Sequence, residues 1–255
     1  MLLGSAFVTT PRASIIIPAR DEGEHIAGVL DQLLCALPPR CEVLVVVDSP
    51  DDRTRSAVTR YGARNPAVTC LVSTYGRGPA NAIRYGMDAA SAAVAVVTMA
   101  DGCDDPRQVG ELIRLVERGA AVAAASRYMP GGRQAGGPLL KGMLSRVAGR
   151  SLYLLAGLGT RDATNSFKAY STRFVRAAGI DSRHGFEVGI ELTAKARRLR
   201  LPVAEIPTTW LGRTAGTSHF RVLRWIPAYL RWYLFSFGPG LTAAQLGARP
   251  GQGRP

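Results

Sequence analysis

An acidic loop follows one of the apolar segments of this chain and is the first place where chemistry is expected. Asp101, Asp104 and Asp105 come directly after the apolar run 93–99. Carboxylates beside a buried strand are costly unless a cation neutralises them, and Mg²⁺ and Mn²⁺ take oxygen ligands from carboxylates and from substrate phosphates. Aspartate followed by proline also begins helices. We therefore expect Asp101 to be a metal ligand and Asp105 to be the cap of a helix that begins at Pro106.

A second acidic pair, Asp48 and Asp52, follows another apolar run. Two interpretations are open. The carboxylates could accept hydrogen bonds from the base and ribose of a nucleotide, or they could cap a helix that begins near Pro50.

Glycine and arginine follow the next apolar run, as Gly76-Arg77-Gly78. The third glycine of a dinucleotide-binding fingerprint is missing, because Pro79-Ala80-Asn81 comes next. A nicotinamide oxidoreductase is therefore a poor hypothesis. The alternative is a backbone turn that opens a helix at Pro79 and holds Arg77 near a phosphate.

The elements that must position these residues alternate along the chain. Short apolar runs rich in valine and isoleucine are separated by helical patterns, and the predicted strands cover 13–18, 42–47, 67–73, 93–99 and 120–125. Strands that are apolar on both faces predict an α/β fold with a mostly parallel sheet covered by helices on both sides. Ligands bind such sheets at the carboxyl ends of the strands, where the acidic residues gather in this chain.

The chain changes character after the fifth run. Residues 129–138 are rich in glycine, which predicts a mobile loop. Helices are expected at 139–155, 185–199 and 220–235, and a strand at 203–207. The residues after Gly238 are rich in glycine, proline and arginine, which predicts disorder.

The last predicted helix has three distinct sides. Arginines (Arg221, Arg224, Arg231) lie on one side, aromatic residues (Trp225, Tyr229, Trp232) beside them, and aliphatic residues opposite (Leu223, Ile226, Leu230, Leu234). Two interpretations are open. The helix could lie in a membrane interface, or it could pack on the sheet domain with its arginines in water.

The overall composition limits the class of protein. The chain carries 32 Lys+Arg against 19 Asp+Glu, a net charge of +13, which indicates an anionic partner. A basic module that binds nucleic acid or a membrane surface is a distant alternative, because the acidic strand ends would repel a polyanion. The four cysteines are scattered, and neither a signal peptide nor an apolar run of about 20 residues is recognised, which favours a cytoplasmic enzyme.

Several motifs, in this order along the chain, resemble family 2 glycosyltransferases, in particular the group similar to dolichyl-phosphate mannose synthases. Residues 15–22 resemble the opening Pro-Ala-x-Asn-Glu signature, with Asp21 in place of asparagine. The further matches are Val46-Val47-Asp48, Gly76-Arg77-Gly78, the Asp101 loop, Ser126-Arg127-Tyr128 with Gly131-Gly132, Asn165-Ser166-Phe167-Lys168, Glu191, and Arg213 with Ser218. The resemblance covers residues 13–220. It implies a GT-A fold, a GDP- or UDP-linked sugar donor, Mg²⁺ or Mn²⁺, and a polyprenyl-phosphate acceptor.

Two further departures from the family pattern concern the metal. If Asp101 is the second acid of the usual Asp-x-Asp motif, Met99 stands in the place of the first acid and Cys103 in the place of the following glutamine. The metal site is then one carboxylate short, and Asp104 is the candidate substitute.

The resemblance also implies roles for individual residues. The donor-binding set is Pro18, Ala19, Asp21, Glu22, Asp48, Gly76, Arg77, Gly78 and Asp101. The catalytic set is Asp101, Arg127, Glu191 and Arg213, and the acceptor-phosphate set is Arg127, Arg133, Arg213 and Ser218. Guanidinium groups match phosphate oxygens with paired hydrogen bonds. Glu187 and Glu191 share one helical face, so the other interpretation is that they pair with Lys195.

The expected reaction is an inverting displacement at the anomeric carbon of a hexose. A lipid phosphate with a second pKa of ~6 is already ionised at neutral pH, so no histidine base is needed from His25, His184 or His219. A soluble metabolite or a glycan is the alternative acceptor.

We expect an N-terminal extension (1–12), a catalytic domain (13–218), an amphipathic helix (219–238) and a disordered tail (239–255). Peripheral contact with the inner face of the cell membrane would bring the enzyme to a lipid acceptor. The oligomeric state is left open.

Overall fold

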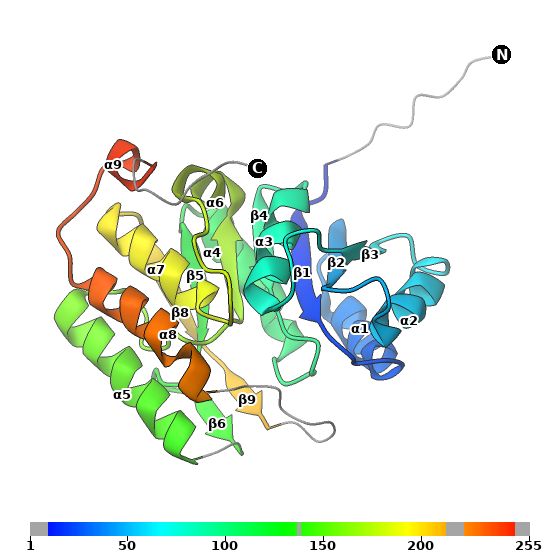
Figure 1. The fold of residues 1–255 in the computed structure, drawn as a ribbon, viewed down its shortest axis with the longest axis horizontal. Helices are drawn as coiled ribbons and strands as arrows, with labels where there is room; N and C mark the ends of the chain where they lie inside the picture. Colours follow the sequence, from blue (N-terminus) through cyan, green and yellow to red (C-terminus); the bar gives the residue numbers. More distant parts are fainter. Residues whose placement is uncertain (1–9, 137–138, 213–221, 248–255) are drawn as a thin grey trace.

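A seven-stranded sheet forms the centre of the protein (Figure 1). The computed structural model describes residues 10–136, 139–212 and 222–247. The strands of the sheet are β1 (Ala13–Ala19), β2 (Cys41–Val47), β3 (Val68–Val72), β4 (Val94–Val97), β5 (Val122–Ser126), β7 (Lys168–Ser171) and β8 (Val203–Pro207). Their order is β3-β2-β1-β4-β7-β5-β8; β7 is antiparallel to both neighbours and the other pairs are parallel. The mostly parallel sheet expected from the sequence is confirmed.

Helices cover both faces of this sheet. One face packs against α1 (His25–Ala36), α2 (Arg53–Gly62) and α4 (Val109–Glu117), and the other against α3 (Pro79–Ala89), α6 (Thr172–Ala178) and α7 (Val188–Arg198). Strand β1 shows why its sequence is apolar throughout: Ile15 and Ile17 belong to the first core and Ile16 to the second.

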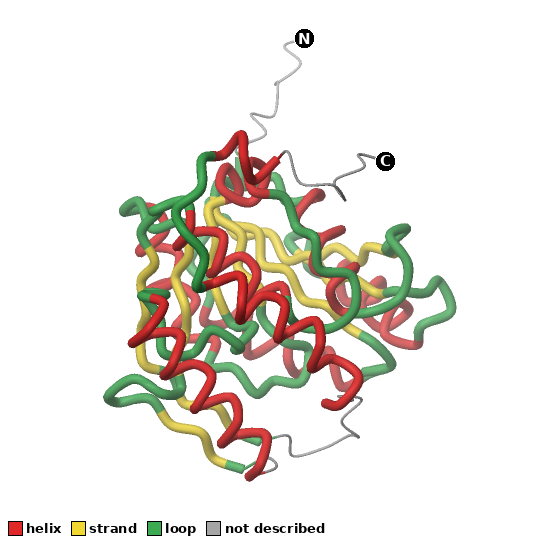
Figure 2. Tube along the Cα trace, turned by 60° about the vertical axis from the view of Figure 1, so that its left-hand side comes forward, coloured by secondary structure: helices red, strands yellow, loops and turns green. Residues whose placement is uncertain are grey.

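Two further helices, α5 (Leu139–Ala156) and α8 (Val222–Ser236), form an outer layer beyond α7 (Figures 1 and 2). Leu152 of α5, Ile190 of α7 and Trp232 of α8 meet in a third core. The Trp232 side chain is buried, and its Nε1 donates a hydrogen bond to Ser182 Oγ at 3.1 Å. The aromatic side of α8 therefore packs on the protein.

Residues 133–135 and 243–247 form regular structure that the sequence analysis does not predict. Strand β6 (Arg133–Ala135) pairs in parallel with β9 (Thr209–Leu211), so the prediction of a loop is wrong at β6. Helix α9 (Ala243–Gly247) packs on α6 and buries Leu246 in the second core. The prediction of disorder is therefore wrong for this helix, and residues 248–255 lie outside the described residues.

The antiparallel strand β7 and helix α6 are not predicted from the sequence, because β7 begins with a lysine and is only four residues long. A short 3₁₀ helix, η1 (Pro106–Gln108), leads into α4. Within the described ranges, no helix combines the length and the apolarity that a membrane span requires.

Candidate active site

A cleft of about 1040 Å³ opens where β1, β2, β4 and β5 end and continues between α5 and α8. Eight residues of the predicted donor, metal, catalytic and acceptor-phosphate sets line it together: Pro18, Ala19, Glu22, Asp48, Gly78, Asp101, Asp104 and Arg127. They come together because the carboxyl ends of neighbouring parallel strands meet at one edge of the sheet. The cleft has a polar half at the strand ends and a largely apolar half between the two outer helices.

Asp48 fixes the turn that begins α3. Its Oδ2 accepts a hydrogen bond from the backbone N–H of Gly78 at 3.0 Å, and the helix begins at the next residue, Pro79. Gly78 has φ 112°, and a Cβ at this position would lie 2.8 Å from the carbonyl oxygen of His184, so only glycine fits. Gly78 and Pro79 both line the cleft, which gives a helix N-terminus suited to an anionic group.

Asp52 has a different role from Asp48. Its carboxylate accepts hydrogen bonds from the backbone N–H of Asp21 at 3.0 Å and of Thr54 at 2.8 Å, and it is the N-cap of α2. The helix-cap interpretation is therefore correct for Asp52. Asp21, Gly76 and Arg77 are exposed and do not line the cleft, so their contacts with a donor remain predictions.

The acidic loop presents two carboxylates to the cleft. Asp101 Oδ1 accepts a hydrogen bond from the backbone N–H of Cys103 at 3.1 Å. Asp104 Oδ2 accepts from Thr98 Oγ1 at 3.0 Å and from the backbone N–H of Met99 at 3.1 Å. Asp105 does not line the cleft; it caps η1 by accepting from the backbone N–H of Arg107, as predicted.

These two carboxylates fit a divalent metal with an incomplete set of protein ligands. Burial, and then the charge of Asp101, raise the pKa of Asp104 to about 7, while its hydrogen bonds and the charge of Arg127 lower it. No group of three or more His, Cys, Asp or Glu residues suited to a metal occurs in the part of the chain that the structure describes. Mg²⁺ and Mn²⁺ commonly bind one or two carboxylates and take water and substrate phosphates as their other ligands. The residues therefore match a metal that is shared with a bound diphosphate.

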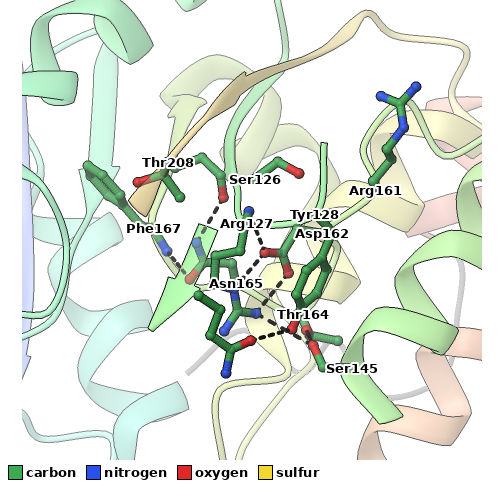
Figure 3. Close-up of polar contacts among 12 residues, drawn as sticks. Ser126, Arg127, Tyr128, Ser145, Arg161, Asp162, Thr164, Asn165, Phe167 and Thr208 are labelled. Carbon is green, nitrogen blue, oxygen red and sulfur yellow. Dashed lines mark hydrogen bonds and ion pairs between the residues drawn. The ribbon is translucent and has the colours of Figure 1, made fainter. Parts of the chain in front are cut away.

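Arg127 directly follows β5, and its guanidinium group forms an ion pair with Asp162 (Figure 3). The carboxylate of Asp162 accepts hydrogen bonds from Arg127 Nε at 2.7 Å, Nη2 at 2.9 Å and the backbone N–H at 3.0 Å. Asp162 is fully buried and does not line the cleft, whereas Arg127 does. Burial alone would lower the pKa of Arg127, but the hydrogen bonds and charge of Asp162 raise it, so the guanidinium stays charged.

A buried lysine organises the loop that carries Asp162. Lys168 Nζ, with no exposed surface, donates hydrogen bonds to the carbonyl oxygens of Asp162 and Ala163, both at 3.2 Å, and of Asn165. Asn165 in turn donates from Nδ2 to the carbonyl oxygen of Ala125 in β5 at 2.8 Å. The motif at 165–168 therefore positions the loop 162–165 against β5. Burial lowers the pKa of Lys168 to about 7.

Glu191, which the resemblance places in the catalytic set, does not reach the cleft. Glu191 is fully buried and does not line the cleft; its Oε1 accepts hydrogen bonds from Lys195 Nζ and the backbone N–H of Asp181, both at 2.6 Å. Its Oε2 accepts from the backbone N–H of Ser182 at 2.9 Å. The alternative, pairing with Lys195, is correct, and Glu187 supports the following residues of the same loop in a similar way.

Of the predicted acceptor-phosphate set, only Arg127 and Arg133 belong to the residues that the structure describes, and Arg127 lines the cleft. Arg133 is exposed on β6 and does not line it. Arg213 and Ser218 lie outside the described residues, as does His219. His25 and His184 are exposed and do not line the cleft.

The structure adds cleft residues that the sequence analysis does not single out. Ser145 of α5 and Thr164 line the cleft beside Arg127, and their hydroxyl oxygens are 2.6 Å apart (Figure 3). Thr164 directly precedes the motif at 165–168, so its position next to that motif could have drawn attention to it. A serine inside a helix, such as Ser145, gives no local signal.

The second half of the cleft is a passage between α5 and α8 with an apolar mouth. Leu144, Val147, Ile226 and Leu230 all line it, and all four are exposed at the surface. Further exposed apolar residues lie along the same two helices: Met143, Leu154 and Leu155 on α5, and Leu234 on α8. The passage therefore opens onto an apolar surface formed by α5 and α8.

Comparison with known proteins identifies relatives over most of the chain. The model of the glycosyl transferase family 2 matches residues 14–178. An undecaprenyl-phosphate mannosyltransferase of Micrococcus luteus is 30% identical over 241 residues, which cover 91% of this chain and 98% of that protein. A polyprenol monophosphomannose synthase of Mycolicibacterium smegmatis is 30% identical over 216 residues, 82% of this chain and 81% of that protein. A mannosyltransferase of Pyrobaculum calidifontis, solved with GDP-Man and Mn²⁺, shares the fold with a TM-score of 0.60 and 17% identity, over 94% of this chain and 69% of that one.

Proposed function

Because the chain belongs to glycosyl transferase family 2, and is therefore a glycosyltransferase of GT-A fold, we propose that it transfers a hexose from a nucleoside-diphosphate sugar to a polyprenyl phosphate. The observation that carries this proposal is the cleft, which joins a carboxylate-lined end to an apolar passage between α5 and α8. A water-soluble acceptor would have no use for such a passage. Mannose is the first sugar to test, since both relatives are named for its transfer.

The polar half of the cleft is the proposed donor site. Asp48, Gly78 and the start of α3 would bind the nucleotide, and Asp101 and Asp104 would hold Mg²⁺ or Mn²⁺. When bound, the metal would neutralise charge on the donor diphosphate and make it a better leaving group. Both carboxylates line the cleft, and the charge of Asp101 adds to burial in raising the pKa of Asp104, so a bound divalent cation would favour the ionised form of both groups.

The acceptor phosphate would attack the anomeric carbon from the side opposite the departing diphosphate, which inverts its configuration. A phosphomonoester with a second pKa of ~6 is largely a dianion at neutral pH, so no protein base is required to activate it. Arg127 contributes a fixed positive charge that aligns this dianion and offsets its repulsion from the donor.

Contact with a membrane would follow from the apolar surface of α5 and α8. Ile226, Leu230 and Leu234 of α8 are exposed while Trp232 is buried, so these three aliphatic side chains lie on the outer side of the helix. Arg146, Arg150 and Arg231 are exposed on the same two helices and would add attraction to anionic lipids. We place the enzyme at the inner face of the cell membrane, where a lipid could enter the passage without leaving the bilayer.

The test is a transfer assay with labelled GDP- and UDP-linked hexoses, Mg²⁺ or Mn²⁺, and a short-chain polyprenyl phosphate, followed by organic extraction. Label should enter the organic phase with one donor and require the metal. A parallel reaction with glycerol phosphate separates a lipid from a soluble acceptor. Label that appears only in the aqueous product, or in none, contradicts the lipid acceptor.

A further inference from the structure

The acidic loop and Arg127 follow two strands that are not neighbours in the sheet. The loop follows β4 and Arg127 follows β5, and β7 lies between these strands. The pairing of β7 with its two neighbours reaches no further than Lys168, which lies opposite Val97 and Ala124. Beyond this point, contacts other than strand pairing hold the acidic loop against the segment that carries Arg127.

One such contact is a pair of side-chain hydrogen bonds between Gln108 and the segment after β8. Gln108 is the last residue of η1; its Nε2 donates to the carbonyl oxygen of Pro207, and its Oε1 accepts from Thr208 Oγ1. Both polar atoms of the amide are therefore used. Gln108 and Thr208 are 100 residues apart in the sequence, so the contact depends on the tertiary structure.

Thr208 connects three parts of the cleft. It is buried, and its backbone N–H donates to the carbonyl oxygen of Ser126, the residue before Arg127, at 3.0 Å (Figure 3). Its own carbonyl oxygen accepts from the backbone N–H of Arg133 in β6 at 2.8 Å. Through Gln108, the same threonine is also joined to the acidic loop.

A backbone hydrogen bond forms a second link between the acidic loop and β9. The N–H of Leu211 donates to the carbonyl oxygen of Cys103 at 3.3 Å. Trp210 and Gly212, on either side of Leu211, line the cleft. Because this second link uses only backbone atoms, the side-chain contact of Gln108 is the one that a substitution can remove.

The pair lies outside the cleft. Neither Gln108 nor Thr208 lines it. The two proposed metal-binding carboxylates accept hydrogen bonds from residues of their own loop, and Arg127 is held by Asp162. Each of these groups is thus held locally, and the contact between Gln108 and Thr208 acts on their position relative to each other.

We propose that Gln108 and Thr208 are positioning residues, whose hydrogen bonds set the acidic loop against the segment of Arg127 and thereby align the bound donor with the acceptor. This inference rests on the proposed function. In a displacement, the attacking oxygen must lie about 3–3.5 Å from the anomeric carbon, and an error of about 1 Å can cost ~100-fold in rate. The pair therefore acts on kcat through the carboxylates and the arginine that it positions.

The experiment removes the pair and separates catalysis from binding. Gln108→Leu removes both hydrogen bonds of the amide, Thr208→Val removes the hydroxyl group, and Thr208→Ser keeps it. Values of kcat and KM are measured with the GDP- or UDP-linked hexose that is active in the transfer assay, Mn²⁺ and a short-chain polyprenyl phosphate. Calorimetry with the matching nucleoside diphosphate and Mn²⁺ measures binding to the donor half independently of turnover.

We expect Gln108→Leu and Thr208→Val each to lower kcat at least ~10-fold, while both KM values and the affinity for the nucleoside diphosphate stay within about twofold. Thr208→Ser should have a kcat close to that of the wild type. Because the two side chains act through one contact, the double variant Gln108→Leu/Thr208→Val should be no slower than Gln108→Leu alone. A merely structural pair would lower the melting temperature and leave the kcat of the folded enzyme unchanged.

Gln245→Leu is the matched control. Gln245 Oε1 accepts hydrogen bonds from Thr242 Oγ1 at 3.2 Å and from the backbone N–H of Thr242 at 2.9 Å, which gives another glutamine–threonine pair at α9. Neither residue lines the cleft, so this variant should keep the kcat of the wild type. A loss of kcat as large as that of Gln108→Leu would show that the effect is not specific to the acidic loop, and the proposal would fail.

The outcomes separate this inference from the proposed function. If the wild type transfers no hexose to the polyprenyl phosphate, the proposed function fails and the inference fails with it. If the wild type is active and the folded variants keep its kcat, the positioning role is refuted while the function stands. A loss of nucleoside-diphosphate affinity as large as the loss of kcat also refutes it, because the pair would then act on donor binding. If Gln108→Leu does not fold, the comparison of Thr208→Val with Thr208→Ser still decides.

Discussion

Membrane contact through α5 and α8 can be tested by changing two exposed leucines. Leu155 on α5 is 74% exposed and Leu234 on α8 is 61% exposed, so the double variant Leu155→Gln/Leu234→Gln removes apolar surface without disturbing the core. We expect weaker binding to vesicles with little change in the free energy of unfolding, because neither side chain is buried in the free protein.

The magnitude follows from the area that insertion would bury. Full burial of a leucine side chain is worth ~1.5–3 kcal/mol, so about two thirds of a side chain gives ~1–2 kcal/mol for each position and ~2–4 kcal/mol for both. This corresponds to a decrease of roughly 30- to 1,000-fold in the partition coefficient. Sedimentation with vesicles of mixed neutral and anionic lipid measures it directly.

Leu201→Gln is the control, because Leu201 is also exposed but belongs to neither α5 nor α8; it follows α7. It should bind vesicles like the wild type. If the double variant binds within about threefold of the wild type, or if Leu201→Gln weakens binding as much, the assignment of this surface to the membrane is refuted.

Three other predictions concern the metal, pH and packing. Asp101→Ala should weaken Mn²⁺-dependent binding of the donor at least ~10-fold by calorimetry, since it removes one of two carboxylates; binding like that of the wild type would reject Asp101 as a ligand. The pKa of Lys168 is lowered to about 7 in the folded state, so unfolding takes up a proton between pH 7 and the ordinary lysine pKa of ~10.4, and the free energy of unfolding should rise with pH in this window. Urea unfolding from pH 7 to 9 should show this rise in the wild type and not in Lys168→Met; equal slopes would contradict the buried lysine as its cause. Gly149→Ala should lower the free energy of unfolding by ~1–3 kcal/mol or more, because its Cβ would lie 2.1 Å from the carbonyl oxygen of Arg161. Gly28→Ala in α1 should instead raise the free energy of unfolding by ~0.5–1 kcal/mol, because a Cβ added at Gly28 would meet no atom within 4 Å. A higher melting temperature for Gly149→Ala than for Gly28→Ala would contradict this reasoning.

The central sheet is well predicted because its signal is local. Strand β1 is apolar on both faces, and its observed bounds differ by one residue from those expected. Asp48, Asp101 and Arg127 each follow such a strand, and parallel strands necessarily bring their carboxyl ends together. The position of these side chains at one cleft therefore follows from the sequence pattern alone.

Strand β7 could not be predicted in the same way. It begins with Lys168, whose charge argues against a central strand. The ammonium group is accommodated only because three carbonyl oxygens of the loop 162–165 surround it. The three-residue strands β6 and β9 likewise form by pairing with each other across more than 70 residues of sequence.

The two carboxylates Asp162 and Glu191 show most clearly which contacts the sequence alone cannot predict. Sequence motifs alone favoured Glu191 for contact with substrate and gave no role to Asp162, yet Glu191 is buried against Lys195 and Asp162 holds Arg127 at the cleft. Residue type and spacing determine that a carboxylate exists and which element carries it. Which cation it meets depends on how helices and loops distant in sequence pack together, because a buried charge takes whichever donors the tertiary structure brings within hydrogen-bond distance.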